Sequence, residues 1–152
     1  MIGDNLQGDL LYAYVAGIID GEGSISMFRI SSKDKPRYAM RVVVGITDPW
    51  LPQFLKMRFG GSVWLAKRNN PKHKDCWFWQ LSAKKAAPFL LSIVPYLCLK
   101  RPQAELALQW QSRRHNCRER HVLTDSERVL DEADKILMMS YNKRGPSAKE
   151  VI

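Results

Sequence analysis

The chain opens with apolar side chains at helical spacing. These positions are Leu10, Leu11, Tyr14, Ile18 and Ile19. The spacing predicts an amphipathic helix that ends between Gly21 and Gly23. Asp20 and Glu22 lie at this end, where the negative pole of the helix dipole disfavours acids. We therefore expect a compensating cation near the end of this helix.

Three small residues of the same helix, Ala13, Gly17 and Gly21, are spaced four apart. They form one stripe along which the backbone of another helix can approach closely. Two copies of the chain packed through this stripe would bring their Glu22 carboxylates close together. Like charges at that range raise each other's pKa unless a cation lies between them.

Two pairs of strands are predicted after this helix. Alternating apolar positions indicate a first pair at residues 24–32 and 38–47, joined by a turn at 33–37. The second pair is expected at 62–68 and 75–82, on either side of a polar loop. Each pair has the pattern of a β-hairpin.

A helix is predicted between the two strand pairs. Asp48 would be its N-cap and Pro49 its first residue. Its apolar stripe is read as Trp50, Phe54 and Met57, and Gly60 and Gly61 would end it.

Three more helices are expected after the second strand pair. Ser82 would cap the first of them, and Pro95 would stop it; another begins near Pro102. Residues 111–121 read as a basic connection, and a Thr124–Glu127 capping box opens the last helix. The expected core positions of these helices are Ala86, Phe89, Leu90, Ile93, Leu106, Ala107, Trp110, Val129, Leu130, Ala133, Ile136 and Leu137.

The order of elements predicts an α+β fold. It would be an αββαββα arrangement with an antiparallel four-stranded sheet, helices on one face, and additional C-terminal helices at about residues 102–140. No linker divides the chain, so we expect one domain over residues 1–152, with a loose tail at 141–152.

Residues 15–23 read VAGIIDGEG, followed by a strand start at 24–26. This motif resembles that of the LAGLIDADG homing endonucleases, with Val15 at the usual Leu and Gly21-Glu22 at the usual Ala-Asp. The resemblance covers about residues 9–110 and implies the αββαββα fold. It also implies that Glu22 holds Mg²⁺ (with Mn²⁺ accepted), that the Gly21 carbonyl adds a ligand, and that Asp20 supports the catalytic centre. Hard oxygen ligands and a scissile phosphate suit this metal.

Lys100 is the third candidate catalytic residue. The segment at 95–100 resembles the family's stretch after the third helix, where a basic residue reaches the edge of the active site. There it would polarise water or steady the charge that develops on phosphate. A solvated lysine between two helices is the alternative, and Arg101 could take the role instead. Both readings remain open.

The sheet is the candidate DNA-binding surface, because alternate side chains of a two-stranded ribbon can reach base edges in the major groove. Lys33, Lys35 and Arg37, in the turn between the first two strands, are expected to contact phosphate rather than bases. The candidates are Ser24, Ser26, Phe28, Ile30, Ser32, Lys33, Lys35, Arg37, Ala39, Arg41, Val43, Arg68, Asn70, Lys72 and Trp79.

Composition supports a polyanionic partner. The chain has 24 Lys and Arg against 15 Asp and Glu, a formal charge of +9, which favours nucleic acid. No apolar run is long enough to span a membrane, and the N-terminus has no secretory signal pattern, so we expect an intracellular protein (cytoplasm, nucleoid or organelle). The odd number of cysteines, 3, argues against a disulfide framework.

The resemblance implies a site-specific homing endonuclease encoded by a mobile intron or intein. One motif per chain predicts a homodimer that makes a double-strand break in a long, roughly palindromic DNA site. Two alternatives share the fold and the charge. One is a maturase that binds its own intron RNA, and the other is a DNA-binding regulator without catalysis, against which the presence of Glu22 argues.

Overall fold

The structure is a computed structural model that describes residues 5–30, 36–115 and 122–143. Several predictions lie outside these residues: Ser32, Lys33 and Lys35 as DNA contacts, the connection at 116–121, and the tail at 144–152. None of the described helices is long and apolar enough to cross a membrane.

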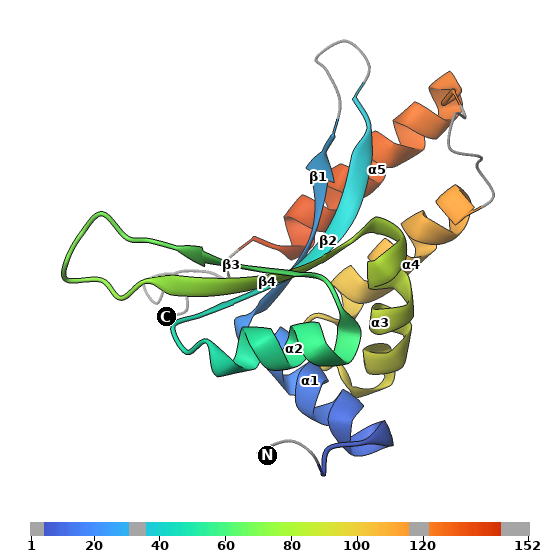
Figure 1. The fold of residues 1–152 in the computed structure, drawn as a ribbon. Helices are drawn as coiled ribbons and strands as arrows, with labels where there is room; N and C mark the ends of the chain where they lie inside the picture. Colours follow the sequence, from blue (N-terminus) through green and yellow to red (C-terminus); the bar gives the residue numbers. More distant parts are fainter. Residues whose placement is uncertain (1–4, 31–35, 116–121, 144–152) are drawn as a thin grey trace, which may run out of the picture.

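The element order matches the predicted one (Figure 1). The helices are α1 (Gly8–Glu22), α2 (Trp50–Phe59), α3 (Ala86–Ile93), α4 (Arg101–His115) and α5 (Asp125–Tyr141), with short 3₁₀ turns η1 (Ala83–Lys85) and η2 (Val94–Tyr96). The strands are β1 (Gly23–Arg29), β2 (Tyr38–Ile46), β3 (Ser62–Ala66) and β4 (Cys76–Ser82).

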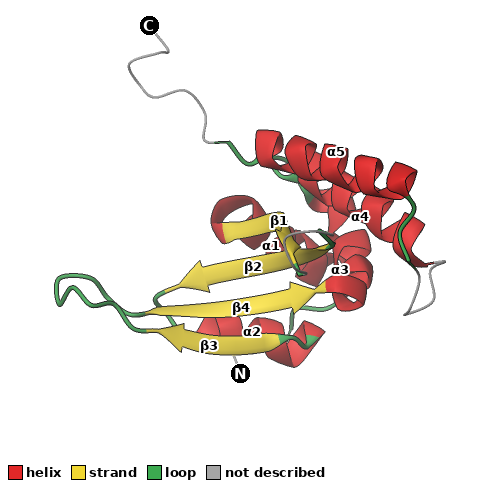
Figure 2. Cartoon of the chain, turned by 90° about the horizontal axis from the view of Figure 1, so that it is seen from above, coloured by secondary structure: helices red, strands yellow, loops and turns green. Residues whose placement is uncertain are grey.

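The four strands form one antiparallel sheet in the order β1-β2-β4-β3. Figure 2 shows α1, α2 and α3 beneath the sheet and α5 beside β1, with α4 between α5 and α3. The core lies between the sheet and these helices. It is built from alternate strand residues, such as Ile25, Val42 and Leu81, and from the inner face of α1. The α+β prediction is confirmed.

The predicted end of α1 and the predicted start of α2 lie within one residue of those in the structure. The α1 helix ends at Glu22, as expected. Asp48 lies one residue before the N-cap that the structure gives α2, yet its carboxylate accepts a hydrogen bond from the Trp50 N–H at 2.7 Å. It therefore caps an orphan donor of the first turn.

The predicted stripe of α2 was partly wrong. Trp50 and Met57 are exposed, while Leu51 and Leu55 are buried beside Phe54. Trp50 instead stacks on Phe54 at the rim of the core, with ring centroids 5.0 Å apart. The helix is rotated from the sequence reading because Leu51 and Leu55, one turn apart, face the sheet.

Two predictions about α3 and α4 also need correction. Ser82 does not cap α3, because the 3₁₀ turn η1 intervenes and no side-chain cap bond forms. Residues 111–115 are not a connection, because α4 continues to His115 and buries Gln111. The expected burial of Leu106 and Trp110 is confirmed.

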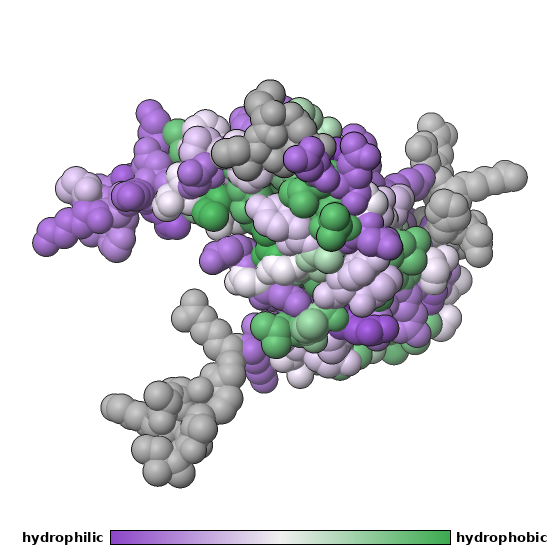
Figure 3. Space-filling view, turned by 90° about the horizontal axis from the view of Figure 1, so that it is seen from below, coloured by the Kyte–Doolittle hydropathy of each residue, from purple (hydrophilic) through white to green (hydrophobic). Residues whose placement is uncertain are grey.

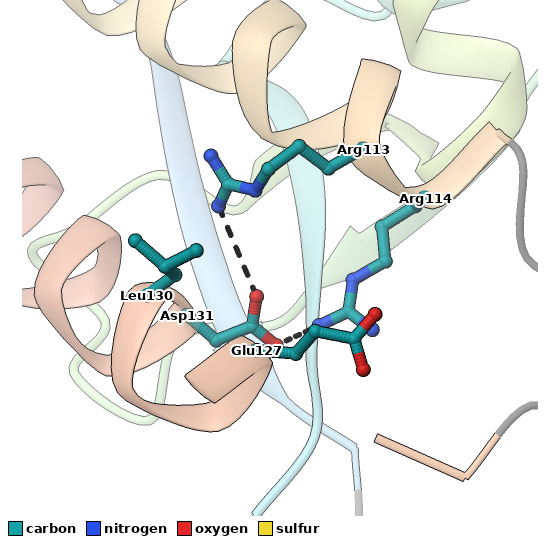
Figure 4. A pocket seen from close by; sticks show the side chains of 5 residues that line it. All are labelled: Arg113, Arg114, Glu127, Leu130 and Asp131. Atoms are coloured by element: carbon teal, nitrogen blue, oxygen red, sulfur yellow. Dashed lines mark ion pairs between the residues drawn. The ribbon is translucent and has the colours of Figure 1, made fainter. Parts of the chain in front are cut away.

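The largest error concerns α5, whose capping box is confirmed but whose orientation was wrong. Its buried residues are Asp131 and Met138, and its apolar stripe faces outward. The cause is a polar anchor on α4. The Asp131 carboxylate, which also accepts from Trp110 Nε1 at 3.1 Å, pairs with Arg113 and Arg114. Both arginines reach from α4 towards it in Figure 4.

The inner side of α5 also covers the edge of the sheet. Lys135 Nζ donates to the carbonyl of Met27, and Asn142 Nδ2 donates to that of Ile25 at 2.8 Å. These carbonyls belong to β1, an edge strand whose backbone would otherwise be open to pairing with another chain. The polar face of α5 therefore stabilises the edge of the sheet, a role that hydrophobic periodicity alone cannot show.

Candidate functional site

Lys100 is the cation that was expected near the acidic end of α1. Its Nζ donates to three carbonyl oxygens at the end of that helix: Ile19 at 2.8 Å, Asp20 at 2.9 Å and Gly23 at 2.6 Å. An ammonium group has three hydrogens, so all of its donors are used. A positive charge here also complements the negative pole of the helix.

Asp20 of α1 in turn binds the backbone of the segment that carries Lys100. Its carboxylate accepts from the backbone N–H groups of Cys98 at 2.8 Å, Leu99 at 3.1 Å and Lys100 at 2.9 Å. Burial acts to raise the pKa of this carboxyl, but these bonds and the Lys100 charge outweigh it and hold the pKa below its usual value. Asp20 and Lys100 thus form a reciprocal clamp between α1 and the turn before α4, called the Asp20–Lys100 clamp below.

The clamp excludes one of the two readings of Lys100, the solvated lysine, and leaves its catalytic role a prediction. Its side chain is half-buried and fully hydrogen-bonded, so the reading of a freely solvated lysine is wrong. Burial lowers the pKa of the Lys100 ammonium, while the charges of Asp20 and Glu22 act to raise it. The ammonium therefore sits within electrostatic reach of both acids of the motif.

Glu22 is the last residue of α1 and is exposed. Among the described residues its carboxylate has no hydrogen-bond partner, which leaves its oxygens accessible to a metal ion. No three His, Cys, Asp or Glu side chains of the described segments lie together as a metal cluster. One chain therefore presents one hard carboxylate, with the Gly21 carbonyl beside it. That donor set fits Mg²⁺ only as part of a larger site.

The small-residue stripe of α1 faces outward. Ala13, Gly17 and Gly21 are all exposed, and a Cβ built on either glycine would meet nothing within 4 Å. Leu10 and Tyr14 are also exposed beside them, against the expectation that they pack inside. Figure 3 views the molecule from below, the side on which α1 lies in Figure 1, and shows apolar patches among polar side chains.

The sheet face opposite the helices carries the predicted β1 and β2 set. Ser24 lies opposite Val43, Ser26 opposite Arg41, and Phe28 opposite Ala39. The prediction that these residues share a face is confirmed by this register. Their contact with DNA is not tested by it, and Ala39 is largely buried.

Arg41 is held in place on this face. Its Nε donates to Ser26 Oγ at 3.3 Å, and its guanidinium lies 5.1 Å from the centroid of the Phe28 ring. These contacts fix the side chain before any ligand arrives, which reduces the entropy cost of using it for recognition.

Trp79 was wrongly assigned to the open face. It is 0% exposed, and its Nε1 donates to the Gly60 carbonyl at 2.8 Å. Its strand neighbours Phe78 and Gln80 lie on the open face instead, opposite Trp64 and Ser62 of β3. A slip of one residue moves a side chain to the other face of a sheet.

Sequence reasoning missed an aromatic pair on the open face. Trp64 is 41% exposed and stacks on Phe78, with centroids 5.4 Å apart and planes 15° apart. Gly45 makes room for the pair, because a Cβ there would lie 2.5 Å from the Phe78 ring. The signal was the alternation in β3, where Trp64 lies one residue from the inward-facing Val63.

The remaining candidates lie at the ends of the two hairpins. Arg68, Asn70 and Lys72 are exposed in the loop between β3 and β4. This loop is ordered by its own bonds, including one from the Arg68 N–H to Asp75 at 2.9 Å. Ile30 is exposed beyond β1, and its N–H donates to the Arg37 carbonyl at 2.8 Å, which continues the first hairpin.

Known proteins show the same architecture. No family model matches the chain. It is 27% identical over 144 residues to the DNA endonuclease I-CvuI of Chlorella vulgaris, covering 92% of this chain and 86% of that one. The intron-encoded archaeal homing endonuclease I-Vdi141I, solved with DNA, matches with a TM-score of 0.71 at 16% identity, over 92% of this chain and 89% of that one.

Two further solved structures are similar to this chain. I-CvuI bound to its target with Ca²⁺ gives a TM-score of 0.69 at 24% identity, over 93% of this chain and 90% of that one. The LAGLIDADG homing endonuclease I-SmaMI, bound to cleaved DNA, gives 0.64 at 19% identity, over 93% of this chain but 47% of that one. The fold is that of the LAGLIDADG homing endonucleases. The resemblance seen in the motif is confirmed, and its single copy fits I-CvuI and I-Vdi141I.

Proposed function

We propose that this chain is a homing endonuclease that cuts both strands of a long, roughly palindromic DNA site as a metal-dependent homodimer. The observation that carries the proposal is the end of α1. There the Asp20–Lys100 clamp fixes the helix terminus that presents Glu22, next to an exposed stripe of small residues. The relative I-CvuI is a DNA endonuclease whose structures hold DNA targets in the presence of Mg²⁺ or Ca²⁺.

The dimer follows from the number of acids. Cutting two antiparallel strands requires two equivalent centres, and one chain has one exposed Glu22. An isologous contact through Ala13, Gly17 and Gly21 would place two such carboxylates side by side. The comparison with I-SmaMI supports this count, because this chain spans only 47% of that DNA-bound chain. Two copies of this chain reach a similar size.

The metal site would be shared between the two copies and the substrate. Glu22 and the Gly21 carbonyl of each copy would hold Mg²⁺ or Mn²⁺, with phosphate oxygens completing the coordination. The bound ion supplies Lewis acidity for phosphodiester hydrolysis. The residues of this chain contribute position and charge. Lys100 keeps the end of α1 fixed and partly offsets the crowded carboxylates, while Asp20 holds the turn that carries Lys100.

The open face of the sheet would bind the duplex. Arg41 is preorganised to reach a guanine edge, while Ser24, Ser26, Phe28 and Val43 surround it. The hairpin ends, with Arg37, Arg68, Asn70 and Lys72 among the described residues and Lys33 and Lys35 outside them, would contact phosphate. The formal charge of +9 supports such a footprint.

We further propose one functional domain over residues 1–152, acting inside the cell, where its DNA substrate lies. The test is direct. The protein is incubated with a library of long duplex DNA sites and Mg²⁺, and the ends of cleaved molecules are sequenced. We expect paired cuts within one site family that disappear when the metal is chelated. Cutting that persists after chelation, or that shows no site preference, would contradict the proposal. Splicing of the host intron with and without the protein tests the maturase alternative.

A further inference from the structure

The apolar and serine side chains on the outward face of α5 are arranged symmetrically about one alanine. Ala133 is at its centre, with Val129 and Leu130 four and three residues before it and Ile136 and Leu137 three and four residues after it. Ser126 and Ser140 lie seven residues to either side. At 3.6 residues per turn these seven positions fall on one side of the helix. They are called the α5 stripe below.

The α5 stripe is uncovered in the described part of the chain. Its four large apolar residues, Val129, Leu130, Ile136 and Leu137, are between 40% and 68% exposed. The polar face of the helix is turned inward by Asp131, Lys135 and Asn142, as described above. Amphipathic helices ordinarily bury the apolar side. An inverted helix of this kind indicates a surface that is buried in an assembly.

The charges of α5 argue against two kinds of occupant. The helix carries five acids and two basic residues within a chain of formal charge +9. Two of these acids, Asp131 and Asp134, are paired with Arg114 and Arg113 of α4. The three remaining acids against two basic residues give no basic cluster for DNA phosphate or anionic lipid. The α5 stripe is therefore unsuited to the duplex that the basic sheet would bind, and unsuited to a membrane surface.

The pattern itself identifies the occupant. In an antiparallel pair of helices related by a two-fold axis, a residue before the centre faces the residue at the same distance after it. With Ala133 on the axis, Val129 would face Leu137 of the partner subunit and Leu130 would face Ile136 of the partner subunit. Ser126 would likewise meet Ser140 of the partner subunit. Every apolar side chain then meets an apolar one, and the small residue lies where the helices come closest.

We infer that α5 forms an antiparallel, isologous contact with α5 of a second copy of this chain. This contact is separate from the proposed α1 pairing, because α1 and α5 lie on different sides of the molecule (Figures 1 and 2). Both can therefore be occupied at once. Each α1-paired dimer has two α5 stripes, so the α5 contact would join α1-paired dimers into a dimer of dimers if the two contacts close on one partner dimer, and into longer chains if they do not. A dimer of dimers would hold two DNA duplexes.

The contact should be weak on its own. A single helix pair buries less than the roughly 1,200 Å² of a typical stable complex. Association through α5 should therefore depend on protein concentration and should follow the tighter pairing through α1.

The test compares arginine substitutions at exposed apolar sites. Ile136→Arg places a charge in the α5 stripe at a side chain that is 61% exposed. Met139→Arg alters the same helix outside the stripe, at 57% exposure, and Leu91→Arg alters α3, at 63% exposure. All three should fold, because none of these side chains is buried. Sedimentation over a wide concentration range is measured for each variant and for the wild type.

We expect the sedimenting mass of the wild type to rise from that of the dimer to that of the tetramer or larger assemblies as concentration rises. Ile136→Arg should weaken this step by about tenfold or more, as loss of a central interface side chain does, while single-site DNA cutting is unchanged. The two control variants should behave as wild type. The inference is overturned if the wild type shows no concentration-dependent step, or if only Leu91→Arg or Met139→Arg removes it.

Two further measurements separate this contact from the α1 pairing. In a Gly17→Leu background, which should break the α1 dimer, Ile136 should still support a monomer–dimer step. In oxidising buffer, Ala133→Cys should cross-link to itself across the axis, because facing Cα atoms at a close helix crossing can meet the 4.4–6.8 Å range of a disulfide. Met139→Cys should give only the background of the native thiols. Equal cross-linking by both variants would contradict the antiparallel register.

Discussion

Replacing Lys100 should destabilise the whole fold, because this side chain joins two segments distant in sequence. Lys100→Met keeps the length of the aliphatic stem and removes the ammonium. Three carbonyls at the end of α1 then lose their donor, at original distances of 2.6 to 2.9 Å. Hydrogen bonds to charged groups contribute about 1.5–3 kcal/mol each when well buried. The site is half-buried and water can replace part of the loss, so we expect about 2–4 kcal/mol in total.

The measurement is urea unfolding of the wild type and three variants. Lys84→Met, at an exposed lysine of η1, is the matched control and should change the free energy of unfolding by less than about 0.5 kcal/mol. Lys100→Arg should fall in between, because a planar guanidinium cannot direct three donors to three converging carbonyls. The unfolding slope should stay constant if only stability changes.

The clamp also predicts coupling between its two members. Asp20→Asn and Lys100→Met should cost less together than the sum of their separate losses, by about 1 kcal/mol or more, because each substitution disrupts the same contact. Additive losses, or a Lys100→Met variant as stable as Lys84→Met, would refute the structural role assigned to Lys100.

Three further predictions concern the dimer, DNA recognition and pH. Gly17→Leu should overfill the α1 contact by about 1–3 kcal/mol or more and lower the sedimenting mass; an unchanged dimer that still cuts would move the interface elsewhere. Arg41→Ala should relax base preference at one symmetric pair of positions, whereas Lys72→Ala should weaken all sequences alike, as binding across a site library reports. The pKa of the Asp20 carboxyl is lowered from 3.8 in the folded chain, so its stabilising contribution is complete above that value and is lost as pH falls through the lower folded pKa. The stability gap between the wild type and Asp20→Asn should therefore narrow in acid; a gap independent of pH down to about pH 3 would count against the Asp20 assignment.

The end of α1 could be predicted from sequence because its signals are local. Glycines, the acids and the following strand start all fall within residues 15–26. The need for a cation was also visible from the helix dipole. The identity of that cation was harder, because Lys100 lies 80 residues from Asp20 and only the resemblance pointed to it.

The assignment of Trp79 to a face of the sheet was wrong because polar and apolar residues do not alternate around it. Residues 77–80 read WFWQ, so three successive aromatics give no period-two pattern. The pairing of Trp79 with Val44 on one side and Val63 on the other settles the face. In β1 and β2 the alternation is clean, and the shared face of Ser26 and Arg41 was correctly predicted.

The α5 error has a different origin. Its apolar period is clear, but the helix is held by Asp131 against Arg113 and Arg114, a contact between helices that no local pattern encodes. Hydrophobic periodicity shows which residues share a face and not which way that face points. In this chain the outward apolar face of α5 is the basis for the inferred contact with a second copy.

Glu22→Gln measures the central claim most directly. The substitution keeps the size of the side chain but removes the charge that would hold the metal, so chemistry should fail. DNA affinity should stay equal or rise slightly, since one negative charge leaves a phosphate-binding surface. Cutting and binding are measured in parallel on the site found for the wild type, with Glu105→Gln, at an exposed acid of α4, as the matched control. The account predicts site-specific binding without cutting for Glu22→Gln and wild-type cutting for Glu105→Gln. Near wild-type cutting by Glu22→Gln would contradict the assignment of Glu22 as the metal ligand.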